Sequence, residues 1–206
     1  MYNTSKVVFS PRVRKSPYFN STIKYGATAF SVYNHMFMPV TYDGTLEDYK
    51  KLLDGVQLWD VGVERQVQIK GPDAESLAQF LTPRNIKKCS IGQAMYTPLT
   101  DFKGNLINDP VMLKIDDDCY WFSVSDGDLL LWAQGIAAGY KFEVDVDEPD
   151  VSPLQVQGPN STKLMTKVFG DWINDLGFYK FKEINHEGIP MVIARMGYSK
   201  ELCYEL

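Results

Sequence analysis

The sequence predicts an α+β fold with mixed or antiparallel sheets, flanking helices and a duplicated strand–helix unit. Three observations predict it. Short apolar runs bounded by turn residues alternate with helical apolar spacing. A segment at residues 69–77 recurs in similar form at 156–164. Hydrophobic residues make up 45% of the 206 residues, which is enough for a sizeable core in one large domain or two small ones.

The front of the chain changes character near residue 26. Residues 1–25 are polar, basic and aromatic, so we expect an irregular N-terminal arm. Residues 27–40 are apolar and aromatic, which indicates the start of a strand. Residues 46–53 are expected to form a short helix, with Thr45 as its N-cap and Asp48 three residues further on.

Strand and helix patterns then follow each other closely. Residues 67–69 alternate and predict a strand that ends at a Gly-Pro pair. Residues 73–81 carry apolar side chains at helical spacing. The segments 95–99 and 110–115 flank a turn-rich stretch at 101–105, so they predict a hairpin.

The middle of the chain repeats the alternation. Residues 120–124 predict a strand, and residues 128–138 predict a helix that ends at Gly139. Residues 142–146 alternate and predict another strand. The acidic run at 145–150 is expected to be a solvated connection.

The recurring segment suggests two related halves. Each copy has an apolar strand end, Gly-Pro, an Asp or Asn cap and an amphipathic helix. A duplicated α+β unit would place a cleft between halves at approximately 26–150 and 151–206. Because Gly-Pro followed by a cap is a common strand-to-helix device, coincidence remains the alternative.

The last residues carry two further strand patterns. Residues 192–194 are apolar and predict a strand, and residues 203–206 look like the beginning of another one. We therefore expect the second half to be incomplete, with C-terminal lobes absent from this chain.

Composition excludes several classes of protein. The formal net charge of −5 argues against general nucleic-acid binding, which needs clustered cations. The basic front is not followed by an apolar signal core, and no stretch of about 18 apolar residues predicts a membrane span. Cys89, Cys119 and Cys203 are odd in number and far apart, as expected of thiols in a reducing cytoplasm.

Two acidic residues in apolar surroundings are the first candidates for a site. The sequence contains no GxGxxG, P-loop, GxSxG or HExxH motif, and its two histidines lack metal-spaced partners, so we expect no metal site. Asp109 and Glu205 each lie within an apolar stretch. A carboxylate there must face solvent, a partner or a ligand, because burying it unpaired is costly. The alternatives are a turn aspartate before Pro110 and a solvent-facing strand glutamate.

Four ordered segments resemble the glycine-cleavage T-protein (aminomethyltransferase) family and span nearly the whole chain. The segments are Trp59-Asp60-Val61 with Ile69-Lys70-Gly71-Pro72-Asp73-Ala74, Tyr96-Thr97-Pro98-Leu99 with Gly104-Asn105-Leu106-Ile107-Asn108-Asp109, Val156-Gln157-Gly158-Pro159, and Arg195-Met196-Gly197-Tyr198-Ser199 with Tyr204-Glu205-Leu206. Any one of them is weak, whereas the ordered set is specific.

Within that family the chain is most similar to the dimethylsulfoniopropionate demethylase branch. The T-protein usually has Ser-His-Met-Gly where this chain reads Gly62-Val63-Glu64-Arg65. The segments that carry the closer similarity are Arg14-Lys15-Ser16-Pro17-Tyr18-Phe19, Tyr33-Asn34-His35-Met36, Asp60-Val61-Gly62-Val63-Glu64-Arg65-Gln66-Val67, Asn108-Asp109-Pro110-Val111 and Gly197-Tyr198-Ser199-Lys200.

The resemblance implies a duplicated βαβ-type domain that binds tetrahydrofolate. Glu205 matches the carboxylate that accepts the two parallel N–H donors of the pterin's guanidine-like edge. Asp109 matches the acidic residue near the reactive folate nitrogens and is the expected catalytic residue. Tyr96, Ser123 and Tyr198 match positions that pack against folate or form hydrogen bonds with it.

The resemblance also implies the reaction, which is methyl transfer from dimethylsulfoniopropionate to give 5-methyltetrahydrofolate and methylmercaptopropionate. Aromatic faces hold sulfonium cations well, so Tyr33 and Phe30 are the candidate substrate contacts. Lys15 is a candidate for the substrate carboxylate, on charge alone.

Other members of the family suggest three alternative functions. One is aminomethyl transfer in glycine cleavage, with an amine substrate and a lipoyl carrier protein as partner. A second is a folate-binding module without catalytic activity, and a third is a folate domain fused to an oxidase. The hypothesis of an oxidase fusion is weakened because the sequence begins with no nucleotide-binding motif. The resemblance leaves a homodimer open.

Overall fold

Residues 11–206 are described by the computed structural model, and they form an α+β fold of antiparallel sheets with flanking helices, as the sequence predicts. The first five-stranded sheet has the order β10-β4-β9-β8-β5. Its strands are β10 (Asp145–Asp147), β4 (Gln66–Lys70), β9 (Cys119–Ser123), β8 (Val111–Asp116) and β5 (Gln93–Tyr96). The helices α3 (Ala74–Phe80) and α4 (Leu129–Tyr140) pack against it.

The second five-stranded sheet has the order β12-β13-β14-β11-β3, again with antiparallel neighbours. Its strands are β12 (Phe181–His186), β13 (Ile189–Ala194), β14 (Cys203–Glu205), β11 (Leu154–Gln157) and β3 (Gln57–Asp60). The helix α5 (Ser161–Phe169) and the 3₁₀ helix η2 (Asp171–Asp175) accompany it. Strand β3 therefore joins the second sheet although it precedes the first sheet in sequence.

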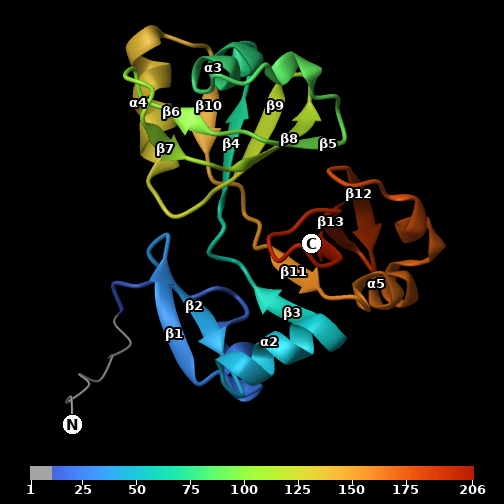
Figure 1. Ribbon diagram of the computed structural model, residues 1–206. Helices are drawn as coiled ribbons and strands as arrows, with labels where there is room; N and C mark the ends of the chain where they lie inside the picture. The colour runs from blue at the N-terminus through green and yellow to red at the C-terminus, as the bar shows by residue number, and fades with distance from the viewer. Residues whose placement is uncertain (1–10) are drawn as a thin grey trace.

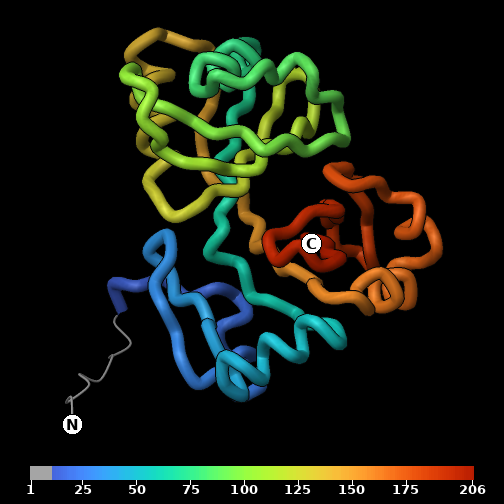
Figure 2. Tube along the Cα trace, viewed as in Figure 1, coloured from blue at the N-terminus to red at the C-terminus, as the bar shows by residue number. Residues whose placement is uncertain are grey.

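The remaining elements form two small hairpins with short helices. Strands β1 (Ala29–Tyr33) and β2 (Met36–Thr41) pair, as do β6 (Leu99–Thr100) and β7 (Leu106–Asn108). The helices are α1 (Phe19–Lys24), α2 (Thr45–Asp54) and the 3₁₀ helix η1 (Ile86–Lys88). Figure 1 shows three groups, namely the first sheet, the second sheet and the β1–β2 hairpin with α2. The trace in Figure 2 runs from the hairpin into the first sheet and then returns to the second.

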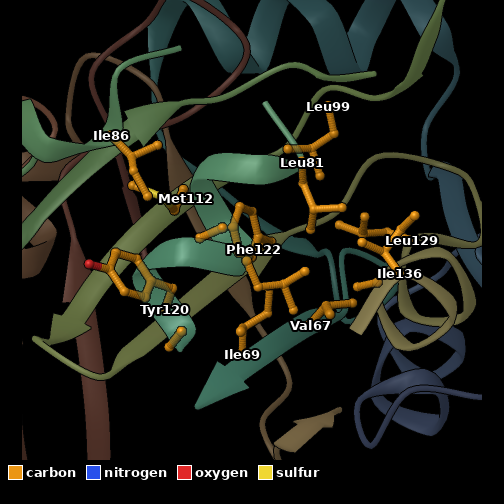
Figure 3. Close-up of a cluster of buried hydrophobic side chains, with 14 of the residues drawn as sticks. Val67, Ile69, Leu81, Ile86, Leu99, Met112, Tyr120, Phe122, Leu129 and Ile136 are labelled. Atoms are coloured by element: carbon orange, nitrogen blue, oxygen red, sulfur yellow. The ribbon is translucent and has the colours of Figure 1, made fainter. Parts of the chain in front are cut away.

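The main core lies between the first sheet and its helices. Ile69, Leu77 and Phe122 have no exposed surface, and Figure 3 shows strand and helix side chains of this cluster meeting. Fully burying one such side chain stabilises the fold by about 1.5–3 kcal/mol. The helical spacing of residues 73–81 correctly predicted α3, and the alternation of residues 67–69 correctly predicted β4. Both patterns arise because each element buries its apolar side chains on one face.

A third cluster fixes the two sheets against each other. Leu113 of the first sheet packs with Phe181 and Ala194 of the second. Backbone hydrogen bonds reinforce the contact, since the Ala94 amide donates to the Tyr179 carbonyl over 2.8 Å and the Phe181 amide donates to the Gly92 carbonyl over 3.0 Å. The two sheets are therefore held together by side-chain packing and by backbone hydrogen bonds.

The recurring segment occupies equivalent places in the two sheets. Strand β4 leads through Gly71 into α3, and strand β11 leads through Gly158 into α5, each strand being second from an edge. Both glycines have positive φ, +138° and +121°. Asp73 and Asn160 occupy the N-cap positions of α3 and α5, as predicted, although neither side chain forms a capping hydrogen bond. The division into halves at residue 150 stays a prediction.

Several predictions for the front of the chain need correction. The irregular arm at 1–25 contains α1, and its residues 1–10 lie outside the described part. The stretch 27–40 does start a strand, β1, but the chain then turns at Asn34 and His35, which adopt positive φ, and returns as β2 up to Thr41. Thr45 is the first residue of α2 and not its N-cap, and Asp48 instead accepts hydrogen bonds from residues 41–43.

Further along, the predicted strands at 120–124, 192–194 and 203–206 are confirmed as β9, β13 and β14. The predicted hairpin is confirmed as two nested pairs, β5 with β8 and β6 with β7. Helix α4 continues through Gly139 to Tyr140 and is closed by Lys141 at φ 59°, so the predicted stop was wrong. The strand predicted at 142–146 lies instead at Asp145–Asp147, inside the stretch expected to be a connection.

Candidate functional site

Asp109 lies between β7 and β8, where the chain turns back into the first sheet. The buried Asn108 side chain donates to the Ser125 carbonyl and accepts from the Ser125 amide, both over 3.0 Å. The Ser125 hydroxyl donates to Oδ1 of Asp109 over 2.5 Å, and the Tyr96 hydroxyl donates to Oδ2 over 3.3 Å. The structure therefore brings the predicted residues Asp109 and Tyr96 together, and adds Ser125, which sequence reasoning missed.

Glu205 lies on β14 and is buried, with 7% of its surface exposed. Gln155 Nε2 on the neighbouring β11 donates to its Oε2 over 2.9 Å. The Ser123 hydroxyl, at the end of β9 in the first sheet, donates to Oε1 over 3.5 Å. Burial raises the pKa of Glu205, although both hydrogen bonds oppose that shift. The predicted contacts Ser123 and Glu205 thus meet where the two sheets face each other.

Glu64 is a third carboxyl at this place, in the segment between β3 and β4. Its Oε2 lies 3.3 Å from the same Gln155 Nε2 that contacts Glu205. Burial, followed by the charge of Glu205, raises the pKa of Glu64 to about 8. Sequence reasoning did not select Glu64, although it lies in Gly62-Val63-Glu64-Arg65, where the chain departs from the usual T-protein pattern.

A cavity of about 490 Å³ opens between the two sheets and is lined in part by Glu205, Gln66, Leu113 and Trp121. Gln66 is only 6% exposed, and its Oε1 has no hydrogen-bond partner. Buried polar atoms normally have partners, so an orphan acceptor beside a cavity indicates a ligand or water that donates to it. The cavity thus combines acceptor oxygens with apolar walls, as small-molecule sites do.

Tyr33 comes to this site from the β1–β2 hairpin. Its pKa is raised by burial first, while Glu64 adds to the shift and a hydrogen bond with Ser125 opposes it. The hairpin turn is held by Asn34, whose Nδ2 donates to the Val63 carbonyl over 2.9 Å. Tyr33 therefore lies close to the residue that orients Asp109.

The other predicted contacts lie in different surroundings. Phe30 packs against Phe19 at a ring-centroid distance of 5.2 Å, and Lys15 Nζ lies 4.7 Å from the centre of the same Phe19 ring. These contacts give both residues a place in the packing of the hairpin group. Tyr198 follows β13 and is 87% exposed. The structure does not bring these three side chains into hydrogen-bonding contact with Asp109 or Glu205.

Three further findings concern metal ligands, membrane-spanning helices and thiols. Among residues 11–206, no group of three or more His, Cys, Asp or Glu side chains is arranged to hold a metal ion. Within the same residues, none of the helices has the length and apolar character needed to cross a bilayer. The three cysteines are buried free thiols.

Comparison with known proteins identifies the family of this α+β domain. The family model described as GCVT N-terminal domain matches residues 18–206, so the chain belongs to that family. The resemblance to the T-protein family is thereby confirmed.

Individual relatives agree with this assignment. The chain is 42% identical over 197 residues to dimethylsulfoniopropionate demethylase DmdA of Ruegeria pomeroyi, covering 96% of this chain and 54% of the relative. It is 28% identical over 197 residues to an aminomethyltransferase of Halothermothrix orenii, covering 94% and 55%. The chain therefore spans about half the length of these curated relatives.

A solved structure supports the fold. Glycine cleavage system aminomethyltransferase T from Bartonella henselae superposes with a TM-score of 0.81 at 22% identity, covering 94% of this chain and 53% of that one. At this level of identity the likeness establishes the α+β architecture alone.

Proposed function

We propose that this chain forms the tetrahydrofolate-binding half of a methyltransferase that demethylates dimethylsulfoniopropionate. The observation that carries the proposal is the buried carboxylate of Glu205, which Ser123 of the first sheet and Gln155 of the second contact beside a cavity. The 42% identity to the demethylase of Ruegeria pomeroyi supports this choice of donor.

The acceptor groups of the cavity suit the pterin ring. A pterin presents two parallel N–H donors on one edge, and a buried carboxylate accepts both in a fork. Glu205 supplies that carboxylate, and the orphan Oε1 of Gln66 is a further acceptor in the same cavity. The indole of Trp121 offers a flat surface for an aromatic ring, and Leu113 adds an apolar wall.

Tetrahydrofolate would supply the nitrogen nucleophile that receives the methyl group, while the sulfonium leaves as a neutral thioether. The role of Asp109 follows from its hydrogen bonds. Two hydroxyl donors fix both of its oxygens, so the carboxylate is held ready to stabilise developing positive charge and to accept a proton. Since a sulfonium needs little acid catalysis, the main contribution of the chain would be orientation.

Tyr33 is the residue best placed to meet a cationic donor. It is half-buried beside Ser125, and an aromatic face stabilises a cation by about 0.5–2 kcal/mol. Phe30 and Lys15 are weaker candidates for substrate contacts, because both side chains already contact the ring of Phe19. Tyr198 could contact folate from its exposed turn if that turn closes over a ligand.

The alternative function is aminomethyl transfer in glycine cleavage. The 28% identity to the aminomethyltransferase of Halothermothrix orenii supports it. That reaction requires a donor carried on a lipoyl protein, whereas demethylation requires a free sulfonium. The two proposals therefore differ in the donor and share the folate site.

The deciding experiment has a binding arm and a donor arm. Titration calorimetry with tetrahydrofolate should show binding by the chain, and Glu205→Gln should weaken it at least tenfold, while Glu47→Gln on the exposed face of α2 should leave it unchanged. Two products are then measured, namely 5-methyltetrahydrofolate with dimethylsulfoniopropionate as the donor, and 5,10-methylenetetrahydrofolate with released ammonia when the loaded lipoyl carrier is the donor. Turnover with the carrier alone would support the alternative, and unchanged affinity in Glu205→Gln would contradict the pterin fork.

A further inference from the structure

A buried carboxyl group, Glu205, and a half-buried one, Glu64, share one amide donor, and we refer to them as the Glu64–Glu205 pair. Gln155 Nε2 lies 3.3 Å from Oε2 of Glu64 and 2.9 Å from Oε2 of Glu205. An amide nitrogen carries two protons and can donate one to each. Within the described residues, no lysine, arginine or histidine lies at ion-pair distance from either carboxyl. Two close carboxylates without a cation cannot both ionise cheaply, so the pair favours holding one proton.

The hydrogen bonds are unequal, and this locates the proton. Glu205 receives donors from both Gln155 and Ser123, at 2.9 and 3.5 Å. Among the side chains of residues 11–206, only Gln155 donates to Glu64, and its distance of 3.3 Å is longer than the 2.9 Å from Gln155 to Glu205. Because hydrogen bonds donated to a carboxylate favour its charged form, the charge settles on Glu205 and the proton settles on Glu64.

An independent observation ties the pair to a ligand. The orphan Oε1 of Gln66 lines the same cavity as Glu205, and the Gln66 side chain is more than nine-tenths buried. Its Nε2 donates to the Glu64 backbone carbonyl over 3.3 Å, which leaves the oxygen as the unused end. An N–H donor of a ligand would satisfy that acceptor.

We propose that Glu64 is a positioning residue that holds the single proton of the Glu64–Glu205 pair and so leaves Glu205 as the charged acceptor for the ligand's N–H edge. The inference rests on the proposed folate site. A bound ring displaces water from the cavity, and a drier pair tolerates a second charge even less. Ligand binding therefore favours retention of the proton, and affinity falls once Glu64 begins to ionise.

The neighbouring groups do not supply this pH dependence. Burial raises the pKa of Tyr33 above its usual value and that of Cys203 to about 11, so both stay neutral near pH 8. Arg65 forms an ion pair with Glu148. The charged and titratable side chains on the elements around the pair are Tyr18, Tyr33, Asp60, Arg65, Asp109, Asp126, Glu148, Asp150, Glu183, Arg195, Cys203 and Tyr204.

The test is the affinity for tetrahydrofolate at pH values on both sides of about 8, where Glu64 is expected to ionise. For the wild-type chain, the dissociation constant should rise above that pH by up to about tenfold per pH unit, as one linked proton requires. Glu64→Gln mimics the neutral acid, so it should keep the affinity at neutral pH and lose the slope. Glu47→Gln should keep the wild-type profile.

A second measurement needs no variant. Calorimetry in two buffers with different ionisation enthalpies counts protons, and the wild-type chain should take up as much as one proton per ligand above pH 8. Zero uptake, or a Glu64→Gln profile parallel to wild type, would overturn the role of Glu64 while leaving the folate site intact. Absence of tetrahydrofolate binding at every pH would instead overturn the proposed function. The pH dependence of unfolding would then still report the proton on Glu64.

Discussion

Ser125 donates a hydrogen bond of 2.5 Å from its hydroxyl to Asp109, and it is itself held by the residue preceding that aspartate. Asn108 makes two hydrogen bonds with the Ser125 backbone, so the contacts form a closed loop. The direction of the Asp109 carboxylate is therefore set before any ligand arrives. Such preorganisation is what a proton acceptor needs if orientation supplies most of the rate.

Asp109→Asn should abolish most methyl transfer and leave the fold intact. The amide cannot accept a proton, and loss of a positioned acid–base group typically costs about 10²–10⁴-fold in rate. Single-turnover formation of 5-methyltetrahydrofolate gives the rate, and circular dichroism checks the fold. Wild-type rates in Asp109→Asn would remove this residue from the mechanism.

Ser125→Ala should lower the rate of methyl transfer less than Asp109→Asn does. Ser125→Thr should recover that rate because it keeps the hydroxyl.

The unfolding free energy should depend on pH through Glu64. The folded pKa is about 8, whereas an exposed glutamate titrates at about 4.3. The folded state binds this proton more tightly, so its stabilisation is complete below about pH 4 and is lost as pH rises through 8. Urea unfolding across that window should show a slope of at most about 1.4 kcal/mol per pH unit that is absent in Glu64→Gln. Equal slopes in the two proteins would show that Glu64 is not protonated in the folded state.

The acidic candidates could be found from sequence, because a charge inside an apolar stretch is visible without a structure. Asp109 and Glu205 were selected in this way, and both lie in hydrogen-bonded sites. Their partners could not be found by this route. Gln155 reaches Glu64 across 91 positions of sequence, and only the pairing of β11 within the second sheet brings it there.

The aromatic candidates show more clearly what the sequence could not predict. Tyr33 and Phe30 lie on one strand and looked equivalent in sequence. The structure places Tyr33 beside Ser125, whereas Phe30 packs with Phe19 and Phe37. An aromatic residue type predicts burial, but the direction of the side chain depends on how the hairpin docks. Helix α4 likewise extends past Gly139, where local propensity predicted an end, and its last residue Tyr140 packs against Phe80.

Asn34→Ala should loosen the hairpin from the first sheet. The side chain is buried, donates to the Val63 carbonyl over 2.9 Å and accepts from the Gly127 amide over 2.8 Å. Leaving these groups without partners should cost about 1–3 kcal/mol each. Urea unfolding measures the loss. Asn34→Gly is the control, because it accommodates the φ of 47° and still lacks the amide. Stability equal to wild type in both variants would contradict the docking role.

Gly158→Ala should destabilise the chain far more than Gly188→Ala, although both glycines have positive φ, +121° and +88°. At Gly158 an added Cβ would lie 2.5 Å from the Gly55 carbonyl oxygen, and backbone cannot move aside as a flexible side chain can. At Gly188 nothing lies within 4 Å. The turn variant should therefore cost only about 1–2 kcal/mol for its backbone conformation, and Gly158→Ala should add about 1–3 kcal/mol for the overlap. Thermal unfolding of the two variants measures the difference, and equal losses would mean that β11 and α2 do not approach each other as closely as described.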